Sequence, residues 1–250
     1  MVELRGELFE NLKSRREAHV WHVEPESIVD PRRLAQYRSW LSTEEEARRR
    51  RFVFEKHRHT FLVSHALVRG VLSRYADVAP ADWRFVAGDH GRPEIAADFL
   101  GGRLRFNLSH TQGMAVLAVV AEVDIGVDVE DADRRELSVD IAERYFAPQE
   151  TADLFNLHER KRLSAFFDYW TLKESYIKAR GMGLAIPLDR FAFRLSPDSP
   201  PTISFAAGFD DDPADWQFAQ FRPSTRHRVA VAIRRGRQDD RPIVLRPILP

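Results

Sequence analysis

The chain has 250 residues, 44% of them hydrophobic, which is enough to bury a core in one large domain or two small lobes. Lys+Arg and Asp+Glu balance at 38 each, which argues against a nucleic-acid-binding protein, and the absence of cysteine excludes disulfides, thiolate metal sites and cysteine nucleophiles. The longest apolar run, residues 114–121, is too short to cross a bilayer and the N-terminus lacks a signal-peptide core, so we expect a cytoplasmic protein without a membrane partner.

The first half of the sequence predicts one strand, two helices and then further strands. Residues 20–23 indicate a strand, and residues 43–51 a charged helix that Ser42 or Thr43 caps. Residues 57–75 carry apolar side chains at steps of three and four, which is typical of an amphipathic helix. Strands are expected after it at residues 83–86, 104–109 and 114–121, with a turn at residues 88–93.

The second half repeats this layout. A strand at residues 125–130 precedes two short helices at 138–144 and 148–157 and a long helix at 161–180, which Gly181 ends. Four strands follow, at residues 191–195, 202–205, 216–221 and 228–233. Because helices and strands are grouped rather than alternating, we expect an α+β fold of two similar lobes, 1–122 and 123–250. Each lobe would pack a long helix on a small, mainly antiparallel sheet, and a pseudo-two-fold would relate the two.

Two carboxylates lie side by side in the strand at residues 125–130. Asp128 and Glu130 are two residues apart, so they point to the same face of an extended strand. Adjacent buried acids repel each other, and a hard cation such as Mg²⁺ removes that cost. The alternative is a strand end whose acids face solvent, and the spacing alone does not decide between the two.

A second acid–base pair lies on the long helix. Glu174 and Lys178 are four residues apart and share one helix face. A carboxylate beside an ammonium suits a phosphoryl-transfer site, in which the acid binds metal or takes a proton and the lysine holds phosphate oxygens. The alternative is an ordinary surface ion pair, which would stabilise the helix by only ~0.3–0.5 kcal/mol.

Several upstream residues are candidates for phosphate binding. Ser109 and His110 end a predicted strand, where they could bind a phosphate or make a local turn hydrogen bond. A guanidinium matches phosphate oxygens bidentately, so Arg51, Arg58 and Arg92 are candidate clamps or, alternatively, solvated side chains. Zinc is disfavoured, because His57 and His59 have no third ligand in register.

The order of these motifs resembles that of the 4′-phosphopantetheinyl transferase superfamily. Four elements carry the resemblance, in sequence order: Gly91-Arg92-Pro93, Phe106-Asn107-Leu108-Ser109-His110, Gly126-Val127-Asp128-Val129-Glu130 and Trp170-Thr171-Leu172-Lys173-Glu174-Ser175-Tyr176-Ile177-Lys178. The resemblance spans residues 21–233, and the length suits the monomeric, two-lobed type that serves carrier proteins of fatty-acid, polyketide or peptide synthesis.

The resemblance implies a role for each matching residue. Asp128, Glu130 and Glu174 would bind Mg²⁺ (Mn²⁺ as the alternative), and Lys178, together with Lys173 as a further candidate, would contact the phosphates of coenzyme A. Asp128, Glu174 and Lys178 would form the catalytic group, with Glu174 as the base. In the lobe of residues 1–122, the 3′-phosphate side would use Arg51, Arg58, Arg92, Pro93, Ser109 and His110. Arg92 stands where many relatives have Lys, and His59 competes with Arg58 because the alignment there could slip by one residue.

The implied reaction moves phosphopantetheine from coenzyme A to a serine of an apo acyl or peptidyl carrier protein and releases adenosine 3′,5′-bisphosphate. Coenzyme A would lie between the lobes, because the acids and the basic residues come from different halves. The alternative is a non-catalytic coenzyme A or nucleotide-binding module, which would keep Arg51, Arg92 and His110 but would not need all three acids.

Overall fold

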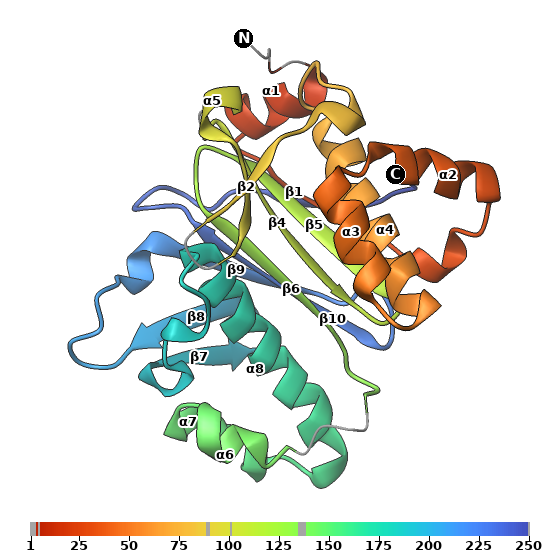
Figure 1. Ribbon diagram of the computed structural model, residues 1–250. Coiled ribbons are helices and arrows are strands. Elements are labelled where there is room, and N and C mark those ends of the chain that lie inside the picture. The colour runs from red at the N-terminus through yellow and green to blue at the C-terminus, as the bar shows by residue number, and fades with distance from the viewer. Residues whose placement is uncertain (1–3, 5, 89–90, 101, 135–138, 250) are drawn as a thin grey trace. The chain divides into compact units, whose positions relative to one another are not determined.

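The computed structural model describes residues 4, 6–88, 91–100, 102–134 and 139–249 (Figure 1). The chain forms two compact units: Met1–Glu122 with Arg241–Pro250, and Val123–Asp240. The sequence-based division placed all of residues 123–250 in the second lobe. In the structure the last ten residues belong to the first unit, because strand β11 (Ile243–Pro247) pairs in parallel with β1 (Ala18–Val23).

The first unit contains one long helix and a four-stranded sheet. Its helices are α1 (Glu7–Ser14), α2 (Pro31–Trp40), α3 (Thr43–Arg51), α4 (Glu55–Leu72) and α5 (Ala97–Leu100). The sheet has the order β11-β1-β5-β4, in which β5 (Met114–Ala121) pairs antiparallel with both β1 and β4 (Leu104–Thr111). A separate hairpin joins β2 (Phe85–Ala87) to β3 (Pro93–Ile95).

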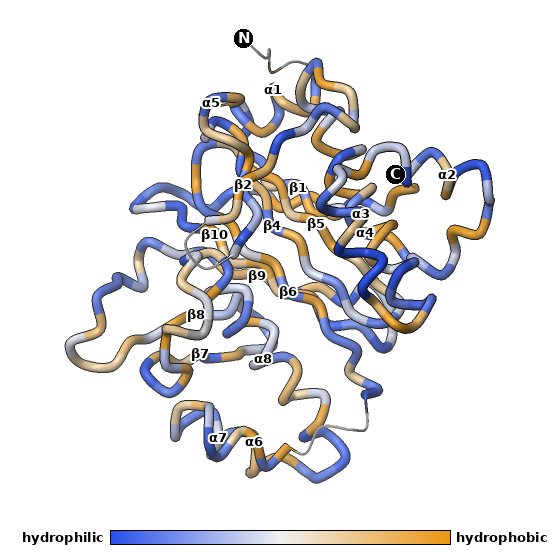
Figure 2. Tube along the Cα trace, in the orientation of Figure 1, coloured by the Kyte–Doolittle hydropathy of each residue, from blue (hydrophilic) through white to orange (hydrophobic). Residues whose placement is uncertain are grey.

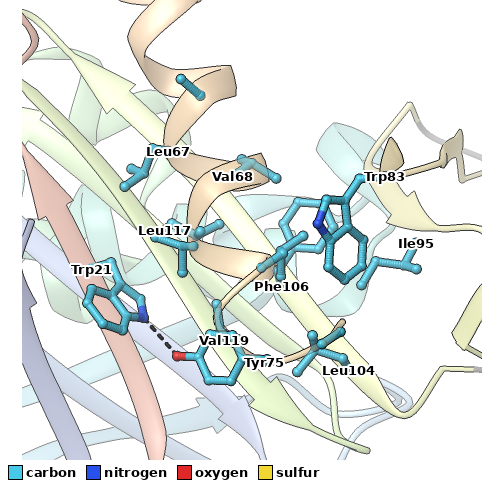
Figure 3. Packing of buried hydrophobic residues seen from close by; sticks show 14 of the residues in the cluster. Trp21, Leu67, Val68, Tyr75, Trp83, Ile95, Leu104, Phe106, Leu117 and Val119 are labelled. Carbon is cyan, nitrogen blue, oxygen red and sulfur yellow. Dashed lines mark hydrogen bonds between the residues drawn. The ribbon is translucent and has the colours of Figure 1, made fainter. Parts of the chain in front are cut away.

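The core of this unit lies between α4 and the sheet. All eight residues of β5 are buried, which fits a continuous apolar strand covered on both faces, and Figure 2 colours most of it as hydrophobic. Leu67 of α4 packs in the same cluster as Leu117 and Val119 of β5 (Figure 3). In the same cluster the indole nitrogen of Trp21 donates to the hydroxyl of Tyr75 at 2.8 Å, so the polar atoms of both rings have partners (Figure 3).

The second unit packs one long helix on a three-stranded sheet. Its helices are α6 (Ile141–Tyr145), α7 (Pro148–Asn156) and α8 (Glu159–Arg180). The sheet has the order β6-β10-β9, with β10 (His227–Arg234) antiparallel to both β6 (Ile125–Asp131) and β9 (Trp216–Phe221). A hairpin of β7 (Phe191–Ser196) and β8 (Ser199–Phe205) completes the unit. Helix α8 packs directly on β6 and β10 (Figure 1).

The predicted α+β fold is confirmed, with a long helix in each unit, a mainly antiparallel sheet in the first unit and an antiparallel sheet in the second. Ser42 is the N-cap of α3, where its side chain and that of Glu45 form a capping box. The sequence interpretation missed α1, α2 and β11, and it placed a turn at residues 88–93, of which Asp89 and His90 lie outside the described residues. Ser138, the expected start of a short helix, lies outside them too. None of the helices in the described ranges has both the length and the apolar character that a bilayer crossing requires.

Candidate active site

Strand β6 and helix α8 bring the downstream acids and Lys178 together. Asp128 and Glu130 are two residues apart on β6 and therefore point to the same face of the strand. The Lys178 ammonium on α8 donates to Asp128 Oδ1 at 2.5 Å. The side chains of Lys178 and Asp128 therefore connect the helix directly to the strand. Asp128 is nearly buried, with 5% of its side chain exposed, whereas 27% of the Lys178 side chain remains exposed.

Helix α8 holds Glu174 and Lys178 on a well-defined scaffold. The His158 side chain accepts from the amide of Arg160 at the N-terminus of the helix, and Gly181 ends it with a φ of 66°. That left-handed conformation suits glycine, which has no Cβ to clash. Both ends of the helix are therefore fixed, and the two functional side chains lie in its last two turns, where the helix crosses β6.

The three carboxylates influence one another electrostatically. Burial, followed by the charge of Asp128, raises the pKa of Glu130 to about 7, although Arg134 and Lys178 act in the opposite direction. Glu174 also contributes to this rise. Burial and then Asp128 raise the pKa of Glu174, against the opposing effect of Lys178. The site is thus a half-buried cluster with more acid than base, which is the arrangement that a bound cation stabilises.

The donor set fits a hard cation that shares its coordination with a substrate. Mg²⁺ takes carboxylate oxygens and usually keeps several waters or substrate phosphates as further ligands. Among the described residues, no three His, Asp or Glu side chains are grouped closely enough to hold a metal ion by themselves. Asp128, Glu130 and Glu174 do not form such a group in this structure, and what agrees with Mg²⁺ is their chemistry and mutual repulsion, with phosphate oxygens or water as the further ligands that the ion would need.

Lys173 does not lie in this site, which corrects its assignment as a phosphate contact. Its ammonium is fully buried and bonds Glu150 Oε2 at 2.7 Å, the carbonyl oxygen of Leu188 at 2.7 Å and that of Phe191 at 2.8 Å. These three acceptors use its three N–H donors. Burial lowers the pKa of Lys173 and raises that of Glu150, whereas the charge of each partner acts in the opposite direction on the other.

In the first unit, Arg92, Ser109 and His110 lie on or beside β4. Arg92 donates through Nη2 to the carbonyl oxygen of Phe106 on β4 at 3.1 Å, which fixes the hairpin residue against the strand. Ser109 is buried and His110 is exposed near the end of that strand. Pro93 begins β3 and is exposed. The structure thus brings the Arg92 segment and the Ser109-His110 segment to the same strand.

The remaining basic candidates lie around the junction of α3 and α4. Arg51 is exposed at the last residue of α3. Arg58 donates through Nε to the carbonyl oxygen of Phe52 at 2.8 Å and pairs with Glu55 at 3.3 Å. The His59 ring lies 2.8 Å from the carbonyl oxygen of Pro25 through Nε2. Arg58 or His59 as the phosphate contact stays an open prediction.

Two residues of the second unit escaped sequence reasoning. Glu150 is the partner of Lys173 and also accepts from the amides of Ala147 and Phe193. The contact with Ala147 caps α7, and the other two join Glu150 to residues far away in the sequence. The sequence feature that could have identified Glu150 is its place as the third residue of a predicted helix that has no polar N-cap residue. Arg134 follows β6 in the sequence, and its charge lowers the pKa of Glu130. The spacing of Arg134 in the sequence did not predict this interaction.

Comparison with known proteins matches both units. A family described as "4'-phosphopantetheinyl transferase superfamily" covers residues 124–233, and one described as "4'-phosphopantetheinyl transferase, N-terminal" covers residues 30–122. The 4'-phosphopantetheinyl transferase HetI of Nostoc sp. is 33% identical over 220 residues, which are 87% of this chain and 87% of that protein. The 4'-phosphopantetheinyl transferase ffp of Bacillus subtilis is 38% identical over 160 residues, which are 64% of this chain and 69% of that protein. The chain therefore belongs to the 4′-phosphopantetheinyl transferase superfamily, and to its larger, two-lobed type.

Proposed function

We propose that the chain transfers 4′-phosphopantetheine from coenzyme A to a serine of an apo carrier protein and releases adenosine 3′,5′-bisphosphate. The observation that carries this function is the grouping of Asp128, Glu130, Glu174 and Lys178 where β6 meets α8. The names of the relatives, including a mouse L-aminoadipate-semialdehyde dehydrogenase-phosphopantetheinyl transferase that is 29% identical, support the same reaction class.

In this reaction Glu174 takes the proton of the attacking serine. The serine oxygen forms a bond to the β-phosphorus of coenzyme A, and the bond from that phosphorus to the bridging oxygen breaks, so that the bridging oxygen leaves on adenosine 3′,5′-bisphosphate. A serine hydroxyl is a weak nucleophile at neutral pH and needs a base. Burial and then the charge of Asp128 raise the pKa of Glu174, which makes its carboxylate a stronger base than that of an exposed glutamate.

Asp128, Glu130 and Glu174 would hold Mg²⁺, with Mn²⁺ as a substitute. When bound, the metal neutralises charge on the pyrophosphate oxygens as the leaving group departs. Lys178 is the second source of positive charge. Its ammonium bonds Asp128, and because its side chain is partly exposed it would be available to hold phosphate oxygens of the substrate.

The first unit would bind the nucleotide end of coenzyme A. Arg92, with Pro93 beside it, and Ser109 with His110 lie on or next to β4, where they would meet the 3′-phosphate. Arg51 and either Arg58 or His59 would add contacts from the α3–α4 junction. We infer that the enzyme acts as a monomer, and sedimentation of the purified protein at assay concentration tests this.

The alternative of a non-catalytic coenzyme A-binding module is not favoured. Such a module has no use for three neighbouring carboxylates, of which Glu130 and Glu174 have pKa values raised first by burial and then by the charge of Asp128. The relatives are named as transferases rather than as binding proteins.

Mass spectrometry tests the proposal directly. A panel of apo carrier proteins is incubated with the protein, coenzyme A and Mg²⁺, and we expect at least one to gain the mass of one phosphopantetheine on its serine. The same mixture with EDTA should give no gain. If no carrier protein in a broad panel is modified while a known transferase modifies all of them, the proposed function is wrong.

A further inference from the structure

Gly126 lies on the same face of β6 as the two acids and touches the backbone of α8. A Cβ built at this position would lie 2.0 Å from the carbonyl oxygen of Ser175 and 2.4 Å from the amide nitrogen of Ala179. Both distances are far below the roughly 3.5–4.0 Å of a normal contact between non-bonded heavy atoms. Any residue other than glycine would therefore push the strand and the helix apart.

The clash cannot be relieved by a side-chain rotation. Ser175 and Ala179 meet Gly126 through main-chain atoms in the last two turns of α8, and these atoms are held by the hydrogen-bonding pattern of the helix itself. A normal contact would require α8 to move away from β6 by more than about 1 Å at this point. Helices and sheets in a packed core move as units, so neighbouring residues would move with the contact.

The helix residues at this contact stand next to the functional ones. Glu174 directly precedes Ser175, and Lys178 directly precedes Ala179. On the strand, Asp128 is the next residue on the same face. The contact at Gly126 therefore determines the height of α8 above β6 at the place where Lys178 reaches Asp128 at 2.5 Å.

We propose that Gly126 is a positioning residue: by allowing direct backbone contact between β6 and α8, it sets the spacing between the Asp128–Glu130 pair and Glu174 with Lys178. The consequence for chemistry rests on the proposed function. A misplacement of about 1 Å in such a group can lower a rate by ~10²-fold, because each ligand and base must reach the same phosphate. Gly126 touches no substrate itself.

The neighbouring strand offers an independent way to disturb the same spacing. Ala232 is the register partner of Gly126 on β10, so its Cβ points to the same face, toward α8, and it is fully buried. Ala232→Val adds two methyl groups beneath the helix without changing β6. Val127 is also fully buried but points to the opposite face of β6, so Val127→Ala destabilises the strand without lifting α8.

The experiment compares Gly126→Ala, Ala232→Val and Val127→Ala by thermal unfolding, by kcat and KM for a carrier protein that the wild type modifies, and by crystallography. We expect Gly126→Ala to lower kcat ~10- to 100-fold with little change in the carrier KM, because geometry at the phosphate changes while the docking surface does not. Ala232→Val should show a smaller loss in the same direction. Val127→Ala should lower Tm but retain kcat, and the crystal structures should show α8 displaced from β6 only in the first two variants.

The proposal is wrong if Gly126→Ala or Ala232→Val folds with α8 unmoved or with kcat within twofold of the wild type. It is equally wrong if Val127→Ala loses as much kcat as Gly126→Ala at a similar Tm, since the effect would then be general destabilisation. Should Gly126→Ala fail to fold, Ala232→Val decides alone. If the wild type modifies no carrier protein, the proposed function fails separately, and the displacement of α8 in the crystal structures still decides the role of Gly126.

Discussion

Two of the lysines of helix α8, Lys173 and Lys178, lie five residues apart, and each has a carboxylate partner in a different setting. Lys173 and Glu150 are both fully buried, one base faces one acid, and the ammonium bonds two further carbonyl oxygens. Lys178 is partly exposed and bonds the buried Asp128, and its charge also acts on Glu130 and Glu174, with Arg134 acting on Glu130 as well.

The difference separates a structural ion pair from a reactive site. A buried ion pair is stable only when its geometry is good and its donors and acceptors all have partners. Such a pair has no donor or acceptor left with which to bind a ligand. A cluster with an excess of one charge raises the energy of the ligand-free protein and lowers it again when an opposite charge arrives. Sequence motifs place both lysines in one segment, and only their surroundings distinguish the fully buried Lys173 from Lys178 beside the three acids.

The largest expected effect is on the reaction at the carboxylates around Lys178. Glu174→Gln removes the proposed base and a metal ligand, so transfer to a carrier protein should fall by ~10²–10⁴-fold while the protein stays folded. Mass spectrometry of the carrier protein measures the loss. The matched control is Glu159→Gln, an exposed glutamate in the first turn of the same helix, which should keep full activity. Full activity of Glu174→Gln would remove this residue from the mechanism.

The next largest effect is on the free energy of unfolding, through the buried pair of Lys173 and Glu150. Lys173→Met leaves the Glu150 carboxylate buried without its cation, which should lower the free energy of unfolding by ~3–5 kcal/mol. Adding Glu150→Leu should recover much of that loss. Lys178→Met should lose less stability, because its side chain is partly exposed, but should weaken coenzyme A binding. Denaturant unfolding and calorimetry measure the two properties, and an unchanged stability of Lys173→Met would contradict its structural role.

The smallest effect concerns pH. The pKa of Glu130 is raised in the folded protein, to about 7 from its ordinary value of 4.5, so folding favours the protonated form. The native state therefore loses stability as pH rises from about 5 to about 7, where the unfolded chain has already released its proton. In metal-free buffer, Glu130→Gln should be more stable than the wild type by roughly 1–3 kcal/mol at pH 8. At pH 4, below both pKa values, the two proteins should unfold alike, and an equal difference at both pH values would contradict this explanation.

The sequence predicted what depends on local pattern. The strand with Asp128 and Glu130, the helix with Glu174 and Lys178, and their order along the chain all follow from periodicity and spacing, and the structure joins them through Lys178 and Asp128. The partners of Lys173 could not be predicted, because Glu150, Leu188 and Phe191 reach it only through tertiary packing. For the same reason the role of β11 was missed, since its pairing with β1 joins the two ends of the chain.

Calorimetric titration of coenzyme A in the presence and absence of Mg²⁺ tests the central claim most directly, with the wild type compared against Asp128→Asn and Glu150→Gln. If the cluster at Lys178 is the metal and phosphate site, Mg²⁺ strengthens coenzyme A binding to the wild type. Asp128→Asn should then lose at least tenfold in affinity, about 1.4 kcal/mol. Glu150→Gln should bind like the wild type as long as it is folded. Equal, Mg²⁺-independent binding by the wild type and Asp128→Asn would contradict the account.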